Sequence, residues 1–327
     1  MDSLDLTGTW AGFSALAVFI VAYSLVVLEE FTHLRKSKPV VLAAGVIWAI
    51  IGLQHFFTGQ HAQLDDAVGE YLVEFAELFL FLLVAMTYVN SMSERQVFEA
   101  LRVRLISLGF SARKLFWVTG FISFFLSALI DNLTTALVMS GIVIAVGKDN
   151  RRFIAVACVN IVVAANAGGA FSPFGDITTL MVWQDGQVQF VEFFALLLPS
   201  LVNYLVPAVF MSLAIRNEHL PSDTETVVMR PGAKRIMGLF GLTVALAVSF
   251  HNFLHLPPFM GMVTGLACLQ IFGFFLRRQE YGDARNHRQR MPGEIPPYDS
   301  FREIARAEWD TLLFFFGVIM SVGGLAY

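Results

Sequence analysis

Long apolar runs alternate with short polar segments along almost the whole chain. A helix that crosses the hydrocarbon core of a bilayer needs about 20 predominantly apolar residues. Runs of about this length occupy residues 10–28, 40–57, 71–89, 193–215, 236–256 and 259–276, and a last run begins at Thr311. This pattern predicts a series of membrane-spanning helices.

Two further apolar runs, residues 115–147 and 153–184, are too long for one straight crossing. Because a helix rises about 1.5 Å per residue, a run of about 33 residues would reach about 50 Å, whereas the hydrocarbon core is about 30 Å thick. Each of the two runs is therefore predicted to contain a bend or a break.

The basic residues indicate how these runs cross the membrane. Two basic residues directly precede residues 115–147, and three follow that run within a short distance. Because Lys and Arg concentrate in cytoplasmic loops, both ends are predicted to be cytoplasmic, which makes the run a re-entrant hairpin. If residues 153–184 then cross once, all 22 Lys and Arg residues fall in inside loops, and the N-terminus lies outside.

The composition agrees with a membrane protein and excludes a soluble domain of this length. Hydrophobic residues make up 56% of the chain and charged residues 15%, whereas soluble domains contain about 25% charged residues. We therefore expect residues 1–327 to form a single all-α polytopic membrane domain. The sequence has no phosphate-binding loop, cysteine metal motif or nucleic-acid patch, so no enzymatic activity, cofactor or nucleic-acid partner is predicted.

The only charged residue within residues 115–147 is Asp131, which lies near the middle of the run. An ionisable group inside a membrane is costly, and this makes Asp131 a candidate functional residue. Asn132, Thr134 and Thr135 follow it with neutral oxygen atoms, which together with a carboxylate suit Na⁺. The alternative is a polar hairpin tip whose side chains only hydrogen-bond to their neighbours.

The 153–184 run has a predicted helix break in front of its only charged residue, Asp176. Paired glycines and a proline interrupt a helix, which a membrane tolerates where the backbone lines a cavity or is buried in protein. The alternative is a simple kink with Asp176 near the outer surface. Since both interrupted runs carry an aspartate and a Thr-Thr pair, we expect one shared site, with Na⁺ or Li⁺ at Asp131 and Asp176. The predicted ion-binding residues are Asp131, Asn132, Thr134, Thr135, Gly168, Gly169, Ser172, Pro173, Asp176, Thr178 and Thr179.

Three glutamates, Glu70, Glu74 and Glu77, share one helix face at the beginning of the predicted span at residues 71–89. The apolar stretch after Glu77 is too short to span a bilayer alone, so Glu74 and Glu77 are expected within the membrane. They are predicted to form a proton pathway or to add a carboxylate to the site. The alternative, an acidic helix end that reaches water, is preferred for Glu70.

Residues 127–135 (SALIDNLTT) and residues 168–179 (GGAFSPFGDITT) resemble the NhaD-type sodium/proton antiporters. These antiporters belong to an ion transporter superfamily that also contains arsenite pumps and dicarboxylate carriers. The second motif discriminates better, because arsenite pumps tend to continue Gly-Asp with Pro-Pro-Asn-like residues, whereas Gly175-Asp176 continues here with Ile-Thr-Thr. The resemblance covers most of the chain.

The resemblance implies two inverted repeats, each contributing a re-entrant hairpin and a broken helix to one midplane site. The first repeat would occupy residues 1–215, and residues 236–327 would form the start of the second. We expect this second repeat to be incomplete through C-terminal truncation, because no second Asp-Asn hairpin follows. The resemblance also implies a homodimer with a moving transport domain in the inner (plasma) membrane of a bacterium.

The favoured hypothesis is secondary antiport of Na⁺ or Li⁺ against H⁺, in which Asp131 and Asp176 bind the cation and the proton in competition. An anion, oxyanion or dicarboxylate carrier of the same superfamily is the alternative, although the two intramembrane carboxylates argue against an anionic substrate. An intramembrane aspartyl protease would also use two aspartates, but the Gly-x-Gly-Asp and Pro-Ala-Leu motifs of such enzymes are missing.

Overall fold

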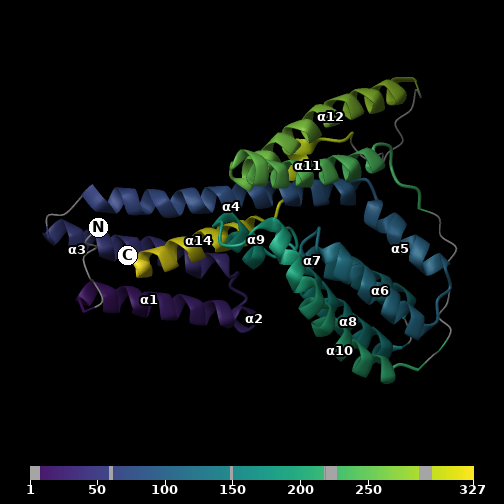
Figure 1. The fold of residues 1–327 in the computed structure, drawn as a ribbon, viewed down its shortest axis with the longest axis horizontal. Coiled ribbons are helices and arrows are strands. Elements are labelled where there is room, and N and C mark those ends of the chain that lie inside the picture. Colours follow the sequence, from purple (N-terminus) through teal and green to yellow (C-terminus); the bar gives the residue numbers. More distant parts are fainter. Residues whose placement is uncertain (1–7, 59–61, 148–149, 217, 219–226, 287–296) are drawn as a thin grey trace. The chain divides into compact units, whose positions relative to one another are not determined.

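The computed structural model describes residues 8–58, 62–147, 150–216, 218, 227–286 and 297–327. Every regular element within these ranges is a helix (Figure 1). Eight of the described helices are long and apolar enough to cross a membrane, by length and composition. The prediction of an all-α polytopic membrane protein is therefore confirmed.

The contacts between residues divide the chain into two compact units, with the boundary inside helix α4. Unit 1 contains the described residues up to Thr87 and those from Phe301 onward, and unit 2 contains the described residues between them. The helices of unit 1 are α1 (Trp10–Val27), α2 (Glu29–Thr32), α3 (Ser37–Thr58), most of α4 (Ala62–Glu94), α13 (Ser300–Ala305) and α14 (Trp309–Ala326). The predicted division into repeats at residues 1–215 and 236–327 stays a prediction.

Within unit 1, α14 packs closely against α3 although more than 250 residues separate them in the chain. A side chain at Gly317 would overlap the backbone of Val40, so the absence of a side chain is what lets the two helices approach. The indole nitrogen of Trp48 donates a hydrogen bond of 2.8 Å to the carbonyl oxygen of Met320. The N-terminal helices and the last helix therefore share one core.

Unit 2 holds the two over-long runs and the helices around them. Its elements are α5 (Val97–Ser107), α6 (Ala112–Ser127), α7 (Asn132–Val146), α8 (Arg151–Gly169), α9 (Ile177–Gln184), the 3₁₀ helix η1 (Phe190–Leu196), α10 (Leu197–Leu213), α11 (Ala233–Leu254) and α12 (Pro258–Asn286). Helices α6, α7, α8 and α10 enclose one apolar cluster. In this cluster Phe124 stacks on Phe171 and on Tyr204, with ring centroids 5.3 and 5.7 Å apart.

Helices α7 and α8 run in opposite directions. At one end, a side chain placed on Gly169 of α8 would meet the amide group of Asn132, the first residue of α7. At the other end, a side chain on Gly147 would meet Ile154 in the first turn of α8. The start of α7 therefore lies at the end of α8, and the end of α7 lies at its start.

Helix α6 runs parallel to α8 and hence antiparallel to α7. The amide nitrogen of Asn160 donates a 3.1 Å hydrogen bond to the carbonyl oxygen of Phe116, and Gly168, two turns further along α8, packs on the carbonyl group of Phe124. Helices α6 and α7 thus form a helical hairpin with its break at residues 128–131, next to Asp131 as predicted. The re-entry of this hairpin from one side of a membrane stays a prediction.

The second over-long run is broken as well. Helix α8 ends at Gly169, residues 170–176 are not helical, and α9 begins at Ile177. The helix break that the glycine pair and Pro173 predicted is therefore confirmed.

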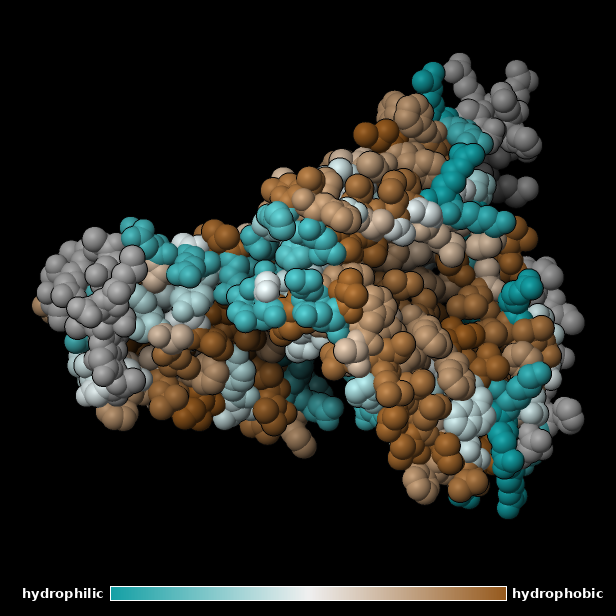
Figure 2. All heavy atoms as spheres, viewed as in Figure 1, coloured by the Kyte–Doolittle hydropathy of each residue, from teal (hydrophilic) through white to brown (hydrophobic). Residues whose placement is uncertain are grey.

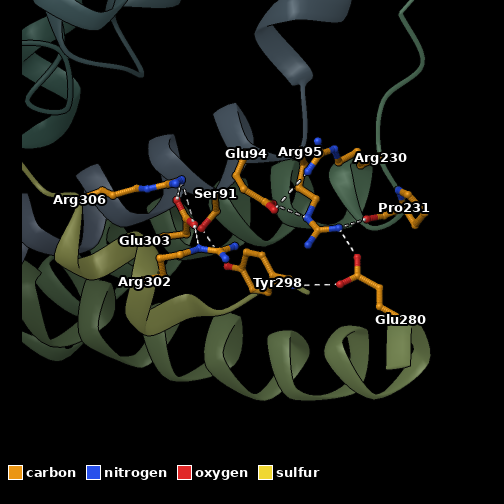
Figure 3. A network of polar contacts seen from close by, with 10 residues as sticks. All are labelled: Ser91, Glu94, Arg95, Arg230, Pro231, Glu280, Tyr298, Arg302, Glu303 and Arg306. Atoms are coloured by element: carbon orange, nitrogen blue, oxygen red, sulfur yellow. Dashed lines mark hydrogen bonds and ion pairs between the residues drawn. The ribbon is translucent and has the colours of Figure 1, made fainter. Parts of the chain in front are cut away.

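Helix α4 extends beyond the predicted span at residues 71–89, because it continues to Glu94. A buried cation at its end explains the extension: Arg95 is 1% exposed. Its Nε pairs with Glu94 at 2.7 Å, its Nη1 pairs with Glu280, and its guanidinium carbon lies 4.8 Å from the ring centre of Tyr298 (Figure 3). Within unit 2, this network joins the end of α4 to α12, and it compensates the polar residues that ended the apolar run.

Candidate functional site

Asp131 ends the hairpin break by capping α7. Its Oδ1 accepts a 2.8 Å hydrogen bond from the backbone N–H of Thr134, in the first turn of the helix. A carboxylate at this position satisfies a free backbone donor and matches the positive end of the helix dipole. No donor in the described part of the chain reaches the other oxygen, Oδ2, and the residue is half-buried. One oxygen of Asp131 is therefore structural, and the other is open to a ligand.

Asp176 performs the same capping role for α9 but uses both oxygens. Its Oδ1 accepts from the backbone N–H and from the hydroxyl of Thr178, at 2.9 and 2.7 Å. Its Oδ2 accepts a 3.0 Å hydrogen bond from the amide nitrogen of Asn132. The carboxylate of the broken helix thus contacts the first residue of α7.

Asn132 is the side chain that joins the two interrupted segments. Its Nδ2 donates to Asp176 and also, at 3.3 Å, to the Oδ1 of Asn166 on α8. Its Oδ1 accepts a 2.6 Å hydrogen bond from the hydroxyl of Ser127, the last residue of α6. This hydroxyl holds the amide with its nitrogen toward Asp176, so the end of α6 orients a group at the start of α7.

Glycines allow the broken helix to lie directly against the hairpin. A side chain at Gly168 would overlap the carbonyl of Phe124, and one at Gly175 would overlap the carbonyl of Ser127. Gly169 packs on the amide of Asn132 in the same way. The approach that brings Asn132 to Asp176 therefore depends on missing side chains on the α8–α9 side.

The break itself is held by hydrogen bonds among its own residues. The hydroxyl of Thr179 donates to the carbonyl oxygens of Ser172 and Asp176, at 2.9 and 2.8 Å. The backbone N–H of Phe174 donates to the Ser172 hydroxyl at 3.2 Å, and Pro173 is buried within the turn. These contacts fix residues 170–176 as a compact non-helical segment rather than a loose kink.

The remaining predicted residues lie in two different places. The hydroxyl of Thr135 faces the carbonyl of Ile130 at 3.5 Å, inside the hairpin break. Glu74 and Glu77 lie on the part of α4 that belongs to unit 1, where Glu74 is exposed and Glu77 is half-buried.

Two residues of this arrangement were not among the predicted ligands, Ser127 and Asn166. Ser127 stands at the end of a row of hydroxyls on α6, after Thr119 and Ser123, which hydrogen-bond to carbonyls of the preceding turn. The spacing of four residues places the row on one helix face and was visible in the sequence. Asn166, one turn before the end of α8, is exposed and could have been found as the polar residue that precedes the glycine pair.

The gathered oxygens comprise two carboxylates, two side-chain amides, hydroxyls and the carbonyls of a helix break. Hard monovalent and divalent cations prefer such oxygen ligands, whereas softer metals prefer nitrogen and sulfur. Helices α7 and α9 both direct their N-terminal ends into this region, but the carboxylates of Asp131 and Asp176 already occupy both capping positions. The arrangement therefore favours a cation over an anion.

Comparisons with known proteins place the chain in a family. The model of the citrate transporter family (CitMHS) matches residues 9–327. The Na(+)/H(+) antiporter NhaD of Vibrio cholerae serotype O1 is 52% identical over 336 residues, covering 99% of this chain and 70% of that protein. NhaD of Halomonas elongata is 51% identical, covering 99% of this chain and 68% of that protein. A more distant relative, sodium/proton antiporter 1 of Arabidopsis thaliana, is 31% identical, and the match covers 94% of this chain and 51% of that protein.

Proposed function

The chain belongs to the citrate transporter family and, within it, to the NhaD-type antiporters, and on this premise we propose that it exchanges Na⁺ or Li⁺ for H⁺ across a membrane. It is a secondary transporter, since its relatives carry the name of Na⁺/H⁺ antiporters and its helices suit a multi-pass bacterial membrane protein. The observation that supports a role of the two breaks in this exchange is the hydrogen bond from Asn132 to Asp176.

The cation and the proton compete for the same carboxylates in this proposal. Na⁺ binds between Oδ2 of Asp131 and the carboxylate of Asp176, with neutral oxygens from the threonines and from the helix breaks completing its shell. When H⁺ replaces it, one carboxylate becomes a hydrogen-bond donor and loses its attraction for Na⁺. Because each ion must leave before the other binds, the movements of the two ions are coupled. The gradient of one ion then drives the other without a further energy source.

The protons reach the site along Glu74 and Glu77 in this proposal. Both glutamates lie on the apolar helix α4, where a carboxyl group is costly unless it has a function. Replacing Glu77 by Gln should reduce proton-coupled Na⁺ movement more than replacing the neighbouring Glu70 by Gln, since Glu70 is exposed near the start of the helix. Equal effects in proteoliposome assays of the two variants would contradict this pathway.

The location and assembly of the protein complete the proposal. It spans the inner membrane of a bacterium with the N-terminus outside and all basic loops in the cytoplasm, since this orientation places every Lys and Arg on one side. It forms a homodimer. Accessibility of single cysteines on the two sides of the membrane tests the orientation, and the mass of the purified protein in detergent tests the dimer.

An anion or dicarboxylate carrier is the second candidate, because the matching family model is named for citrate. The carboxylates of Asp131 and Asp176 at both helix N-termini disfavour it, since an anion would have to displace them. An intramembrane aspartyl protease needs two aspartates on facing continuous helices, whereas both aspartates here follow helix breaks.

Proton movement in inside-out vesicles tests the exchange. On addition of Na⁺ or Li⁺, vesicles that contain the 327-residue chain should lose their pre-formed proton gradient. Vesicles that contain Asp131→Asn or Asp176→Asn should keep it. Asp185→Asn is the matched control, because Asp185 is an exposed residue at the opposite end of α9. A response to citrate in place of Na⁺, or full Na⁺ exchange by both site variants, would contradict the proposal.

A further inference from the structure

Unit 2 contains a large apolar recess on the side of the hairpin that faces α5 and α11. Its volume is about 1120 Å³, and it is lined by residues of α5, the tip of the α6–α7 hairpin, residues 227–229 and the first half of α11. Figure 2 shows this part of the molecule as predominantly apolar, with hydrophilic side chains along the right-hand margin of the view. A recess of this size exceeds the range of about 300–1000 Å³ that small-molecule sites usually occupy.

The charges in the recess have one sign. Of the described residues that line it, only Arg104 on α5 and Lys234 in the first turn of α11 are charged. Neither forms an ion pair with an acidic side chain anywhere in the described ranges, and both are exposed. Two unpaired cations at the margin of an apolar recess suit a ligand with a negative group and a large apolar body.

The start of α11 strengthens the positive potential there. The helix has no acidic residue in its first turn, and its capping residue, Gly232, offers no side chain to the free N–H groups. A cation such as Lys234 is unfavourable at the positive end of a helix dipole, so stability of the helix does not explain it. A phosphate near this end would be attracted by the helix dipole and by Lys234 together.

We infer that the recess binds an anionic phospholipid, with its phosphate at Arg104 and Lys234 and its acyl chains between α11 and the hairpin tip. The tip contributes Leu129 and Ile130, which directly precede Asp131. In the proposed orientation both cations lie on the cytoplasmic side of the membrane, so the ligand is a lipid of the inner leaflet. The lipid thereby contacts the two residues that directly precede the candidate ion ligand Asp131.

Lipid retention measured by native mass spectrometry tests the inference. The whole chain is purified in detergent and offered phosphatidylglycerol or phosphatidylcholine with identical acyl chains. Because each basic residue near a membrane surface contributes a factor of about five in attraction for an anionic lipid, we expect a preference of roughly 25-fold for phosphatidylglycerol. Arg104→Gln with Lys234→Gln should abolish this preference, whereas Arg151→Gln with Arg152→Gln, two exposed arginines outside the recess, should preserve it.

A second pair of variants separates the acyl chains from the headgroup. Gly241 lines the recess, Gly238 on the same helix does not, and a side chain at either position meets no atom within 4 Å. Gly241→Trp should therefore reduce retention of both lipids by a common factor, and Gly238→Trp should leave retention unchanged. Equal retention of the two lipids by the unaltered chain, a preserved preference in the double glutamine variant, or equal retention by the two tryptophan variants would each overturn the inference. The assay requires no transport, so it fails or succeeds independently of Na⁺/H⁺ exchange.

Discussion

Each of the two helix breaks of unit 2 ends in an aspartate that caps the following helix, but the two carboxylates differ in their further hydrogen bonds. Asp131 and Asp176 each follow a break, and each caps the next helix through Oδ1. Oδ1 of Asp176 also accepts from the hydroxyl of Thr178. The main difference lies at Oδ2, which is without a described donor in Asp131 and accepts from Asn132 in Asp176. The capping role explains why a carboxylate is tolerated at each position, and only the difference at Oδ2 separates a group that is open to an ion from one that is held in place.

The largest expected effect comes from removing the charge while keeping the cap. Asparagine caps a helix about as well as aspartate, so Asp131→Asn should leave the unfolding temperature nearly unchanged and abolish Na⁺-dependent proton movement. Asp176→Asn should also abolish movement, because the amide has one acceptor oxygen and cannot accept hydrogen bonds from both Thr178 and Asn132. Thermal unfolding by tryptophan fluorescence and vesicle assays, run on the same preparations, check both. If Asp131→Asn unfolds early, the charge of Asp131 has a structural role and the comparison fails.

A smaller but still severe effect should follow from closing the gap between the breaks. Gly168→Ala would place a methyl group inside the carbonyl of Phe124, and backbone atoms cannot yield cheaply. We expect a loss of up to about 3 kcal/mol in the free energy of unfolding.

Gly141→Ala on α7 is the matched control, because a side chain there meets no atom within 4 Å. It should be neutral or stabilise by up to about 1 kcal/mol, since alanine favours a helix interior over glycine. Equal unfolding free energies of the two variants would show that the breaks do not pack as described.

The hydroxyl of Ser127 sharpens the comparison further, because it orients the amide that distinguishes the two carboxylates. Ser127→Ala removes one buried hydrogen bond and should cost about 1 kcal/mol of stability. It should also raise the Na⁺ concentration needed for half-maximal exchange, since Asn132 can then turn away from Asp176. Ser127→Thr, which restores a hydroxyl, should recover the Na⁺ dependence at least in part.

Ser123→Ala provides the control for that substitution. Ser123 lies one turn earlier on the same face of α6, and among the described residues its hydroxyl bonds only to the carbonyl of Thr119. The loss in stability should be similar, whereas the Na⁺ dependence should stay unchanged. A shift of equal size in both variants would mean that Ser127 acts through packing rather than through Asn132.

The smallest expected effect is the loss of the stability that an N-cap side chain contributes. Alanine at either aspartate removes the cap as well as the charge, and an N-cap contributes about 1 kcal/mol. Asp131→Ala should thus be less stable than Asp131→Asn by about this amount, as measured by denaturant unfolding. If alanine and asparagine give the same unfolding free energy, the hydrogen bond to Thr134 does not stabilise α7.

The sequence allowed the positions of both breaks to be predicted, and it left their connections open. The length of each apolar run demanded an interruption, and Gly168, Gly169 and Pro173 marked one of them. The packing of α8 against the hairpin decides which oxygen faces which donor. No local sequence pattern encodes this packing. Asn132 therefore emerged as the connecting residue only from the packing of two segments that lie more than 30 residues apart.

The end of α4 is a second feature that could not be predicted from the sequence. Hydropathy falls after residue 89, so the predicted span stopped there, but the helix continues to Glu94. Its polar end is compensated by the adjacent Arg95, which contacts Glu280 and the ring of Tyr298, and these two residues lie far away in the chain. A buried ion pair of this kind cannot be inferred from apolar length, because its partners are chosen by the tertiary structure.

The packing of α14 on α3 has a consequence for biosynthesis. The two parts of unit 1 flank the whole of unit 2 in the chain, which places residues 88–300 between them. At a synthesis rate of about 5–20 residues per second, α3 waits roughly 13–54 s for α14 to leave the ribosome. During this time the surface that Val40 and Trp48 offer to α14 remains uncovered, while unit 2 emerges. The segment that carries the candidate ion site is therefore complete before the part of the protein that begins first.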